Sequence, residues 1–160
     1  MKKILYLHGL ESSNVGDKVD FLKERAVVLA PSIDYRKSNI EEELMYMVES
    51  FQPDLIIGSS MGGYAALNLG NYFDIPVIAF NPAIHSRSFD PAFRELIEQD
   101  PHFNFIPTIV LGLKDDVINP SKTVDIFDNA DFEIQYELYP ELGHRISFDV
   151  FVDIYNKYVK

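Results

Sequence analysis

One stretch of this chain, a serine between closely spaced glycines, limits the local fold more than any other. It reads Gly58-Ser59-Ser60-Met61-Gly62 and is followed directly by Gly63. The apolar run before it predicts a short buried strand, and the Ala- and Leu-rich run after it predicts a helix. A tight strand-to-helix turn leaves no room for side chains two residues on either side of its apex, which explains the paired glycines. We therefore expect Ser60 at the apex, with its hydroxyl above the sheet edge.

The pentapeptide pattern is short, and an ordinary glycine turn is the alternative interpretation. The strand before the pattern and the helix after it favour a catalytic serine at Ser60. Ser59 lies on the strand side of the apex and is expected to be a packing residue. The motif alone therefore predicts a nucleophile but not a reaction.

Composition limits the class of protein. A chain of 160 residues, with 47% apolar and 24% charged residues, predicts one soluble domain over residues 1–160. The absence of cysteine excludes disulfides, thiol catalysis and cysteine-based metal sites. The charged start and the apolar run at Ile4–Leu7 imitate a signal peptide, but that run is too short for one. No segment reaches transmembrane length, so a cytoplasmic location is expected.

The formal net charge of −11 bears on partners. Nucleic acids and anionic membrane surfaces would be repelled, so neither is expected as a partner. Polyanionic substrates such as coenzyme A esters are disfavoured for the same reason. The alternative is that the acidity serves solubility alone.

Strand-like and helix-like segments alternate along the whole chain. Strands are expected at Lys3–Leu7, Ala26–Ala30, Asp54–Gly58, Pro76–Phe80, Pro107–Gly112 and Phe132–Tyr139. Helices are expected around Val15, Val19 and Leu22, over 40–51, after the glycine turn, at Pro91–Gln99, at Lys122–Asn129 and over 148–159. This alternation predicts a mostly parallel sheet with helices on both faces. The irregular stretch over 81–105 is expected to form a small lid or pocket wall.

Ligands of such sheets bind outside the carboxyl ends of the strands, so the residues after each strand are candidates for chemistry. His8-Gly9-Leu10 follows the first strand. The glycine turn would direct the Leu10 amide into the site, where it would form a two-donor oxyanion hole with the Met61 amide. His8 itself is expected to be structural and bound within its loop.

Acidic and imidazole side chains follow the fifth and sixth strands. Asp115-Asp116 comes after the fifth, and His144 lies in a glycine-bearing loop after the sixth. With Ser60 these give the chain order Ser…Asp…His, which predicts a catalytic triad. Asp115 is favoured as the acid, and Asp116 is the alternative. No metal site is expected, and His85 and His102 have no such placement; their role is open.

The chain resembles the α/β-hydrolase superfamily, and within it the small, nearly capless YqiA-type esterases. The matching residues are Tyr6-Leu7-His8-Gly9-Leu10 with Ser12-Ser13, Ala30-Pro31, 58–64, Asn81-Pro82-Ala83, Asp115-Asp116-Val117 and Gly143-His144. The resemblance implies a minimal six-stranded, mostly parallel sheet of order 2-1-3-4-5-6. It also implies a Ser60–His144–Asp115 triad, backbone oxyanion donors at Leu10 and Met61, and no cofactor.

Three functions remain open at this point. The first is hydrolysis of short, uncharged carboxylic esters, since the short segment over 81–105 suggests an open, shallow site. The second is thioester or amide hydrolysis by the same triad. The third is a binding protein that retains the fold without turnover. A small-molecule ester is the expected partner of the first, and assembly into a homo-oligomer is open.

Overall fold

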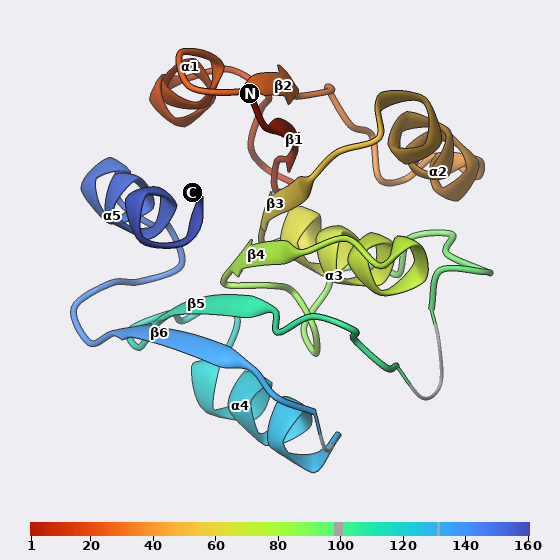
Figure 1. Ribbon diagram of the computed structural model, residues 1–160. Coiled ribbons are helices and arrows are strands. Elements are labelled where there is room, and N and C mark those ends of the chain that lie inside the picture. Colours follow the sequence, from red (N-terminus) through yellow and green to blue (C-terminus); the bar gives the residue numbers. More distant parts are fainter. Residues whose placement is uncertain (98–100, 131) are drawn as a thin grey trace.

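The computed structural model describes residues 1–97, 101–130 and 132–160 and has a six-stranded sheet at its centre (Figure 1). The strands are β1 (Lys3–Leu7), β2 (Val27–Leu29), β3 (Leu55–Ser59), β4 (Val77–Phe80), β5 (Thr108–Gly112) and β6 (Gln135–Tyr139). They are ordered β2-β1-β3-β4-β5-β6, and each neighbouring pair is parallel. The order predicted from the sequence is confirmed.

Helices cover both faces of the sheet (Figure 1). They are α1 (Asp17–Lys23), α2 (Ile40–Phe51), α3 (Met61–Phe73), α4 (Pro120–Asn129) and α5 (Phe148–Tyr158). Buried residues of α1 and α5 pack on one face, and those of α2, α3 and α4 pack on the other. No helix within the described residues is long and apolar enough to cross a bilayer.

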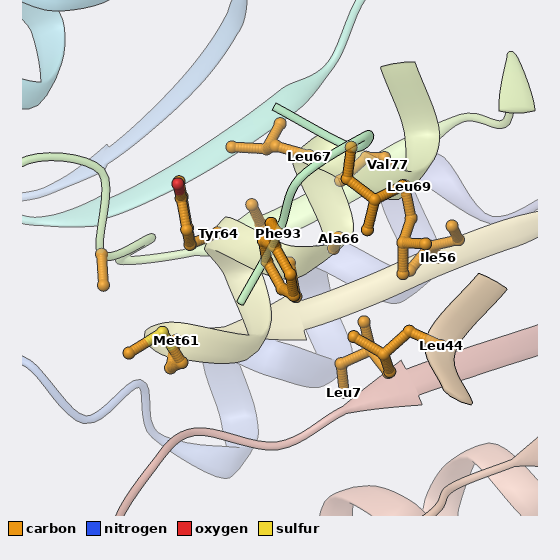
Figure 2. Packing of buried hydrophobic residues seen from close by; sticks show 14 of the residues in the cluster. Leu7, Leu44, Ile56, Met61, Tyr64, Ala66, Leu67, Leu69, Val77 and Phe93 are labelled. Carbon is orange, nitrogen blue, oxygen red and sulfur yellow. The ribbon is translucent and has the colours of Figure 1, made fainter. Parts of the chain in front are cut away.

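The alternation of side chains along each strand produces these two cores. On β1, Ile4 and Tyr6 pack with α1 and α5, whereas Leu5 and Leu7 pack with α2 and α3. Figure 2 shows the second of these cores, in which Leu7 lies near Leu44 of α2 beneath the residues of α3. Each fully buried aliphatic side chain stabilises the fold by roughly 1.5–3 kcal/mol. Side chains buried on both faces therefore stabilise the sheet that carries the loops at its edge.

Glu41, in the first turn of α2, is buried, whereas Glu42 beside it faces solvent. Its Oε2 accepts hydrogen bonds from the backbone amides of Glu95, at 2.9 Å, and Leu96, at 3.0 Å. A buried carboxylate needs such donors. Phe93 of the same segment stacks on Tyr64 of α3, with ring centroids 5.9 Å apart. The 91–97 segment is thus fixed to both α2 and α3.

The helix predicted at Pro91–Gln99 is wrong over residues 91–97, which form no helix. The reason is a contact distant in sequence: the amides of Glu95 and Leu96 bind the Glu41 side chain, so a helical i→i−4 ladder does not form there. The remainder of that prediction, residues 98 and 99, lies outside the described residues.

Smaller differences concern element ends. Val15 was expected on the buried face of the first helix, but it is 73% exposed and precedes Gly16, where the chain turns into α1. The sixth strand was expected from Phe132 but begins at Gln135. Phe132 instead packs edge-on against Phe103 and Phe127. Apolar residues next to an element extend a sequence pattern without joining the ladder.

Candidate active site

Ser60 lies at the carboxyl edge of the sheet, in the turn between β3 and α3. Its φ of 55° and ψ of −116° are rare for a residue with a side chain and cost on the order of 1–3 kcal/mol. A Cβ at Gly58 would lie 2.1 Å from the carbonyl oxygen of Gly62. A Cβ at Gly62 would lie 2.0 Å from the carbonyl oxygen of Leu7. The glycines therefore permit the tight turn that the sequence predicts.

Backbone hydrogen bonds fix this turn to the end of β4. The Ser60 amide donates to the Phe80 carbonyl at 2.9 Å. The Ser60 carbonyl accepts from the amides of Tyr64, at 3.1 Å, and Ala83, at 3.0 Å. Both backbone polar groups of Ser60 are satisfied, so the surrounding structure maintains its unusual conformation.

The side chains of Ser60, His144 and Asp115 form a continuous chain of contacts. Nε2 of His144 lies 3.0 Å from Oγ of Ser60, and Nδ1 lies 2.8 Å from Oδ2 of Asp115. Because a carboxylate only accepts hydrogen bonds, Nδ1 carries the proton and Nε2 presents its lone pair to the serine. In this tautomer the imidazole can accept a proton from Ser60.

Asp115 is held rigidly, whereas Asp116 is outside the contact chain. The Asp115 side chain is fully buried, at 0% exposed, and its Oδ1 accepts from the amides of Val117 and Ile118 at 2.9 Å each. Asp116 is exposed. Of the two adjacent aspartates, the structure brings Asp115 to His144. The His144 side chain is 24% exposed, so solvent and a small molecule can reach it.

His8 is buried within the loop that follows β1. Its Nε2 accepts from the Ile33 amide at 2.9 Å, so Nδ1 carries the proton and donates to the Gly9 carbonyl at 2.6 Å. The Tyr35 hydroxyl donates to the His8 carbonyl at 2.6 Å. Burial raises the pKa of Tyr35, which keeps this donor protonated. These contacts agree with the prediction that His8 is structural and hydrogen-bonded within its loop.

The predicted oxyanion donors Leu10 and Met61 each follow a residue of this site. A Cβ at Gly9 would lie 3.3 Å from Cβ of Ser60, so Gly9, which precedes Leu10, lies close to the serine. Met61 is the first residue of α3, where amides have no helical partner. Within the described residues, neither amide donates a backbone hydrogen bond to the protein. Their function as oxyanion donors stays a prediction.

Two buried polar residues to which the sequence assigns no role are tied to this edge. Tyr35 fixes the His8 carbonyl, as described above. Asn81 follows β4 directly and binds the loop of His144 through its side chain. The rule that directs attention to residues after strands points to Asn81, but nothing local indicates what its side chain contacts. Tyr35 carries no such signal.

The remaining histidines differ in their surroundings. Nε2 of His85 donates to the carbonyl of Asn119 at 3.0 Å, and Asn119 caps the N-terminus of α4. His102 is exposed. Among the described residues, no group of three or more His, Asp or Glu side chains is arranged to hold a metal ion.

A hollow of about 420 Å³ lies elsewhere, lined by residues that include Gln52, Pro53, Phe73 and Ile75. Pro53 precedes β3 and Ile75 precedes β4, so this hollow is at the amino edge of the sheet. Ligands of parallel α/β sheets bind at the opposite, carboxyl edge. We therefore place the candidate chemistry at Ser60 and not in the hollow.

Comparison with known proteins identifies the family. Residues 3–104 match the uncharacterised protein family UPF0227, which is well over half of the chain. The chain belongs to this family. The YqiA-type resemblance drawn from the sequence is confirmed.

Solved structures with a similar fold are α/β hydrolases. A monoacylglycerol lipase from Paleococcus ferrophilus aligns over 97% of this chain and 93% of its own, with a TM-score of 0.70 and 13% identity. A ferulic acid esterase from Anaeromyces mucronatus aligns over 97% and 76%, with a TM-score of 0.65 and 22% identity. A lidless serine hydrolase from Xanthomonas campestris aligns over 96% and 79%, with a TM-score of 0.61 and 14% identity. At these identities the likeness establishes the α/β-hydrolase fold of this UPF0227 member.

Proposed function

We propose that the protein is a serine hydrolase that cleaves small, uncharged carboxylic esters through an acyl-enzyme formed on Ser60. One observation carries the proposal: the unbroken path from Oγ of Ser60 through His144 to the buried carboxylate of Asp115. Each of the two contacts lies within hydrogen-bonding distance, and the imidazole has the tautomer that a general base needs.

The reaction would proceed in two halves. His144 takes the proton of Ser60 as Oγ attacks the ester carbonyl carbon, and the C–O bond to the alcohol then breaks. The alcohol leaves with the proton from His144, and the acyl group stays on Oγ. In the second half a water molecule gives its proton to His144 and attacks the acyl carbon. Ser60 regains its proton as the carboxylic acid departs.

Asp115 and two backbone amides would stabilise charge during these steps. The Asp115 carboxylate compensates the imidazolium that forms on His144. The amides of Leu10 and Met61 would bind the oxyanion, and their lack of backbone acceptors within the described residues supports this. Losing one donor of such a pair costs roughly 10²–10³ in kcat.

Substrate size and charge follow from the surroundings of the site. His144 is partly open to solvent, and the segment over 81–105, which would serve as the lid, is short, so small acyl groups are favoured. The net charge of −11 disfavours anionic substrates. The lipase and esterase activities of the structural neighbours belong to the same reaction class.

A turnover panel would test the proposal. Purified wild-type protein and Ser60→Ala would be assayed on matched esters, thioesters and amides with neutral or charged acyl chains of increasing length. We expect the highest kcat/KM on short neutral esters, and no turnover of any substrate by Ser60→Ala. A clear preference of the wild type for thioesters or amides would contradict the proposed ester specificity and would make that class the substrate instead. Equal turnover by Ser60→Ala would contradict the mechanism.

A further inference from the structure

The turn after β4 contains a buried side chain that the proposed mechanism does not use. Asn81 is 1% exposed and has a φ of 41°. That left-handed conformation is uncommon for a residue with a side chain, although Asn adopts it more readily than most. Asn81 lies between Phe80 and Ala83, whose backbones bind Ser60. A strained conformation next to the backbone groups that bind Ser60 indicates that the surrounding structure holds Asn81 in place.

The side-chain amide of Asn81 is fully used. Nδ2 donates to the carbonyls of Gly143, at 3.1 Å, and His144, at 2.7 Å, while Oδ1 accepts from the Gly112 amide at 2.9 Å. Carbonyls only accept and a backbone amide only donates, so these partners fix which end of the side chain is Nδ2. One side chain thus joins the ends of β4 and β5 to the loop of His144.

The loop of His144 packs closely against the end of β5. A Cβ at Gly112 would lie 2.3 Å from the Gly143 carbonyl oxygen, so the two backbones are in direct contact. The Lys114 amide also donates to the Leu142 carbonyl at 2.9 Å. The side-chain Nδ2 of Asn81 donates to two main-chain carbonyls of this loop, and one of these is the carbonyl of His144 itself.

We propose that Asn81 is a positioning residue for the reaction, which holds the backbone of His144 so that the imidazole stays between Ser60 and Asp115. This inference rests on the proposed function. Among the described residues, the hydrogen bonds of the Asn81 side chain go to backbone groups of the His144 loop and β5, and none of them reaches Ser60 or the imidazole, so Asn81 would act through His144 and not on substrate. Misplacing a reacting group by about 1 Å can lower the rate by roughly 10²-fold. Loss of the Asn81 side chain should therefore lower kcat and leave KM nearly unchanged.

Two substitutions separate the side chain from the backbone conformation. Asn81→Gly accepts the left-handed φ without strain but offers no hydrogen bonds. Asn81→Asp keeps the shape and the acceptor for Gly112 but has no donor for the two carbonyls. Asn68→Asp is the matched control, because it also removes a side-chain amide bond to a carbonyl, that of Tyr64 at 2.9 Å within α3.

The first measurement is steady-state ester hydrolysis by folded protein, checked by circular dichroism. We expect kcat to fall about 100-fold in both Asn81 variants with KM within about threefold of wild type, and Asn68→Asp to stay near wild type. A folded Asn81→Gly variant with kcat within about threefold of wild type would overturn the inference.

The second measurement is the proton NMR signal of the His144 Nδ1–H, which reports its contact with Asp115 without any turnover. We expect a low-field signal in wild type that shifts or broadens in both Asn81 variants but not in Asn68→Asp. An unchanged signal in the Asn81 variants would overturn the inference. If wild type hydrolyses nothing, the proposed function fails, and this signal still decides the part played by Asn81.

A third measurement uses the wild-type protein alone and therefore tests the inference even if the Asn81 variants do not fold. In the wild-type protein, both Nδ2 protons of Asn81 should exchange with solvent far more slowly than those of the exposed Asn129. Exchange at the rate of Asn129 would overturn the inference, because it would mean that the two carbonyl bonds do not persist.

Discussion

The two oxygens of the Asp115 carboxylate make different contacts. Oδ1 accepts the amides of Val117 and Ile118 and so fixes the loop, while Oδ2 faces Nδ1 of His144. The position of the carboxylate therefore does not depend on the histidine. At this residue, backbone amides orient the carboxylate, and the carboxylate orients the imidazole of His144.

Exchanging Asp115 for Asn would separate shape from charge. If the new amide group faced Nδ1, the imidazole would have to accept there and carry its proton on Nε2, where it could not take a proton from Ser60. We expect Asp115→Asn to fold normally and to lose roughly three to four orders of magnitude in kcat on a short ester.

Asp116→Asn is the matched control for that substitution, since Asp116 is adjacent, chemically identical and exposed. It should keep most of the wild-type activity. The reverse pattern, in which Asp116→Asn is inactive and Asp115→Asn is active, would mean that the acid is Asp116.

At the scale of elements, the contact between α3 and the strands depends on the absence of side chains. A Cβ at Gly62 would lie 2.0 Å from the Leu7 carbonyl oxygen at the end of β1, whereas at Gly143 the nearest atom is the Lys114 carbonyl oxygen at 3.7 Å. The first distance requires the backbone to move, and the second is ordinary van der Waals contact.

We therefore expect Gly62→Ala to lower the free energy of unfolding by at least about 3 kcal/mol, or to prevent folding. Gly143→Ala should change it by no more than about 1 kcal/mol. Urea denaturation followed by circular dichroism would measure both. Similar stabilities for the two variants would contradict the close packing of α3 on β1.

The pattern of elements was predictable because each signal is local. Apolar runs bounded by Pro and Gly predicted six strands, and their alternation with helices predicted a mostly parallel sheet. The strand order came from the resemblance to the α/β hydrolases. The exception is instructive: residues 91–97 carry a helical apolar pattern, but their amides bind Glu41, about 50 residues earlier in the chain. Local spacing cannot reveal a distant carboxylate that competes for backbone donors.

The candidate site was predictable for a related reason. Ser60, Asp115 and His144 each follow a strand, and parallel strands bring their carboxyl ends to one edge. What could not be predicted is the set of bonds that fixes them. The contacts of Asn81 with Gly112 and Gly143 depend on the register of β4, β5 and the last loop, which no short motif encodes.

Across the whole molecule, the core on the α1 and α5 face is rich in aromatic rings and holds an ionisable group. Tyr6 packs edge-on against Phe151, with ring centroids 6.4 Å apart. Burial, with a smaller effect from the charge of Asp17, raises the pKa of Tyr6 to about 12. Ionisation of this hydroxyl in the folded protein is therefore disfavoured relative to the unfolded chain, where the pKa is about 10.

The consequence is a defined loss of stability in alkali. Below about pH 10 the hydroxyl is protonated in both states, so its contribution is fully present. As the pH rises from about 10 to about 12, the unfolded chain releases this proton before the folded protein does, and the contribution is lost. Between about pH 10 and about pH 12, the free energy of unfolding of the wild type should fall by roughly 2–3 kcal/mol more than that of Tyr6→Phe. Urea unfolding at several alkaline pH values would measure it, and parallel curves for the two proteins would contradict the assignment.

The central claim is that the fold activates Ser60 as a nucleophile, and covalent labelling tests it most directly. Wild type, Ser60→Ala and Ser59→Ala would be treated with a fluorophosphonate and analysed by intact-mass spectrometry and peptide mapping. We predict one adduct on Ser60 in wild type and in Ser59→Ala, and none in folded Ser60→Ala. Labelling that persists in Ser60→Ala, or folded wild-type protein that does not react, would contradict the claim.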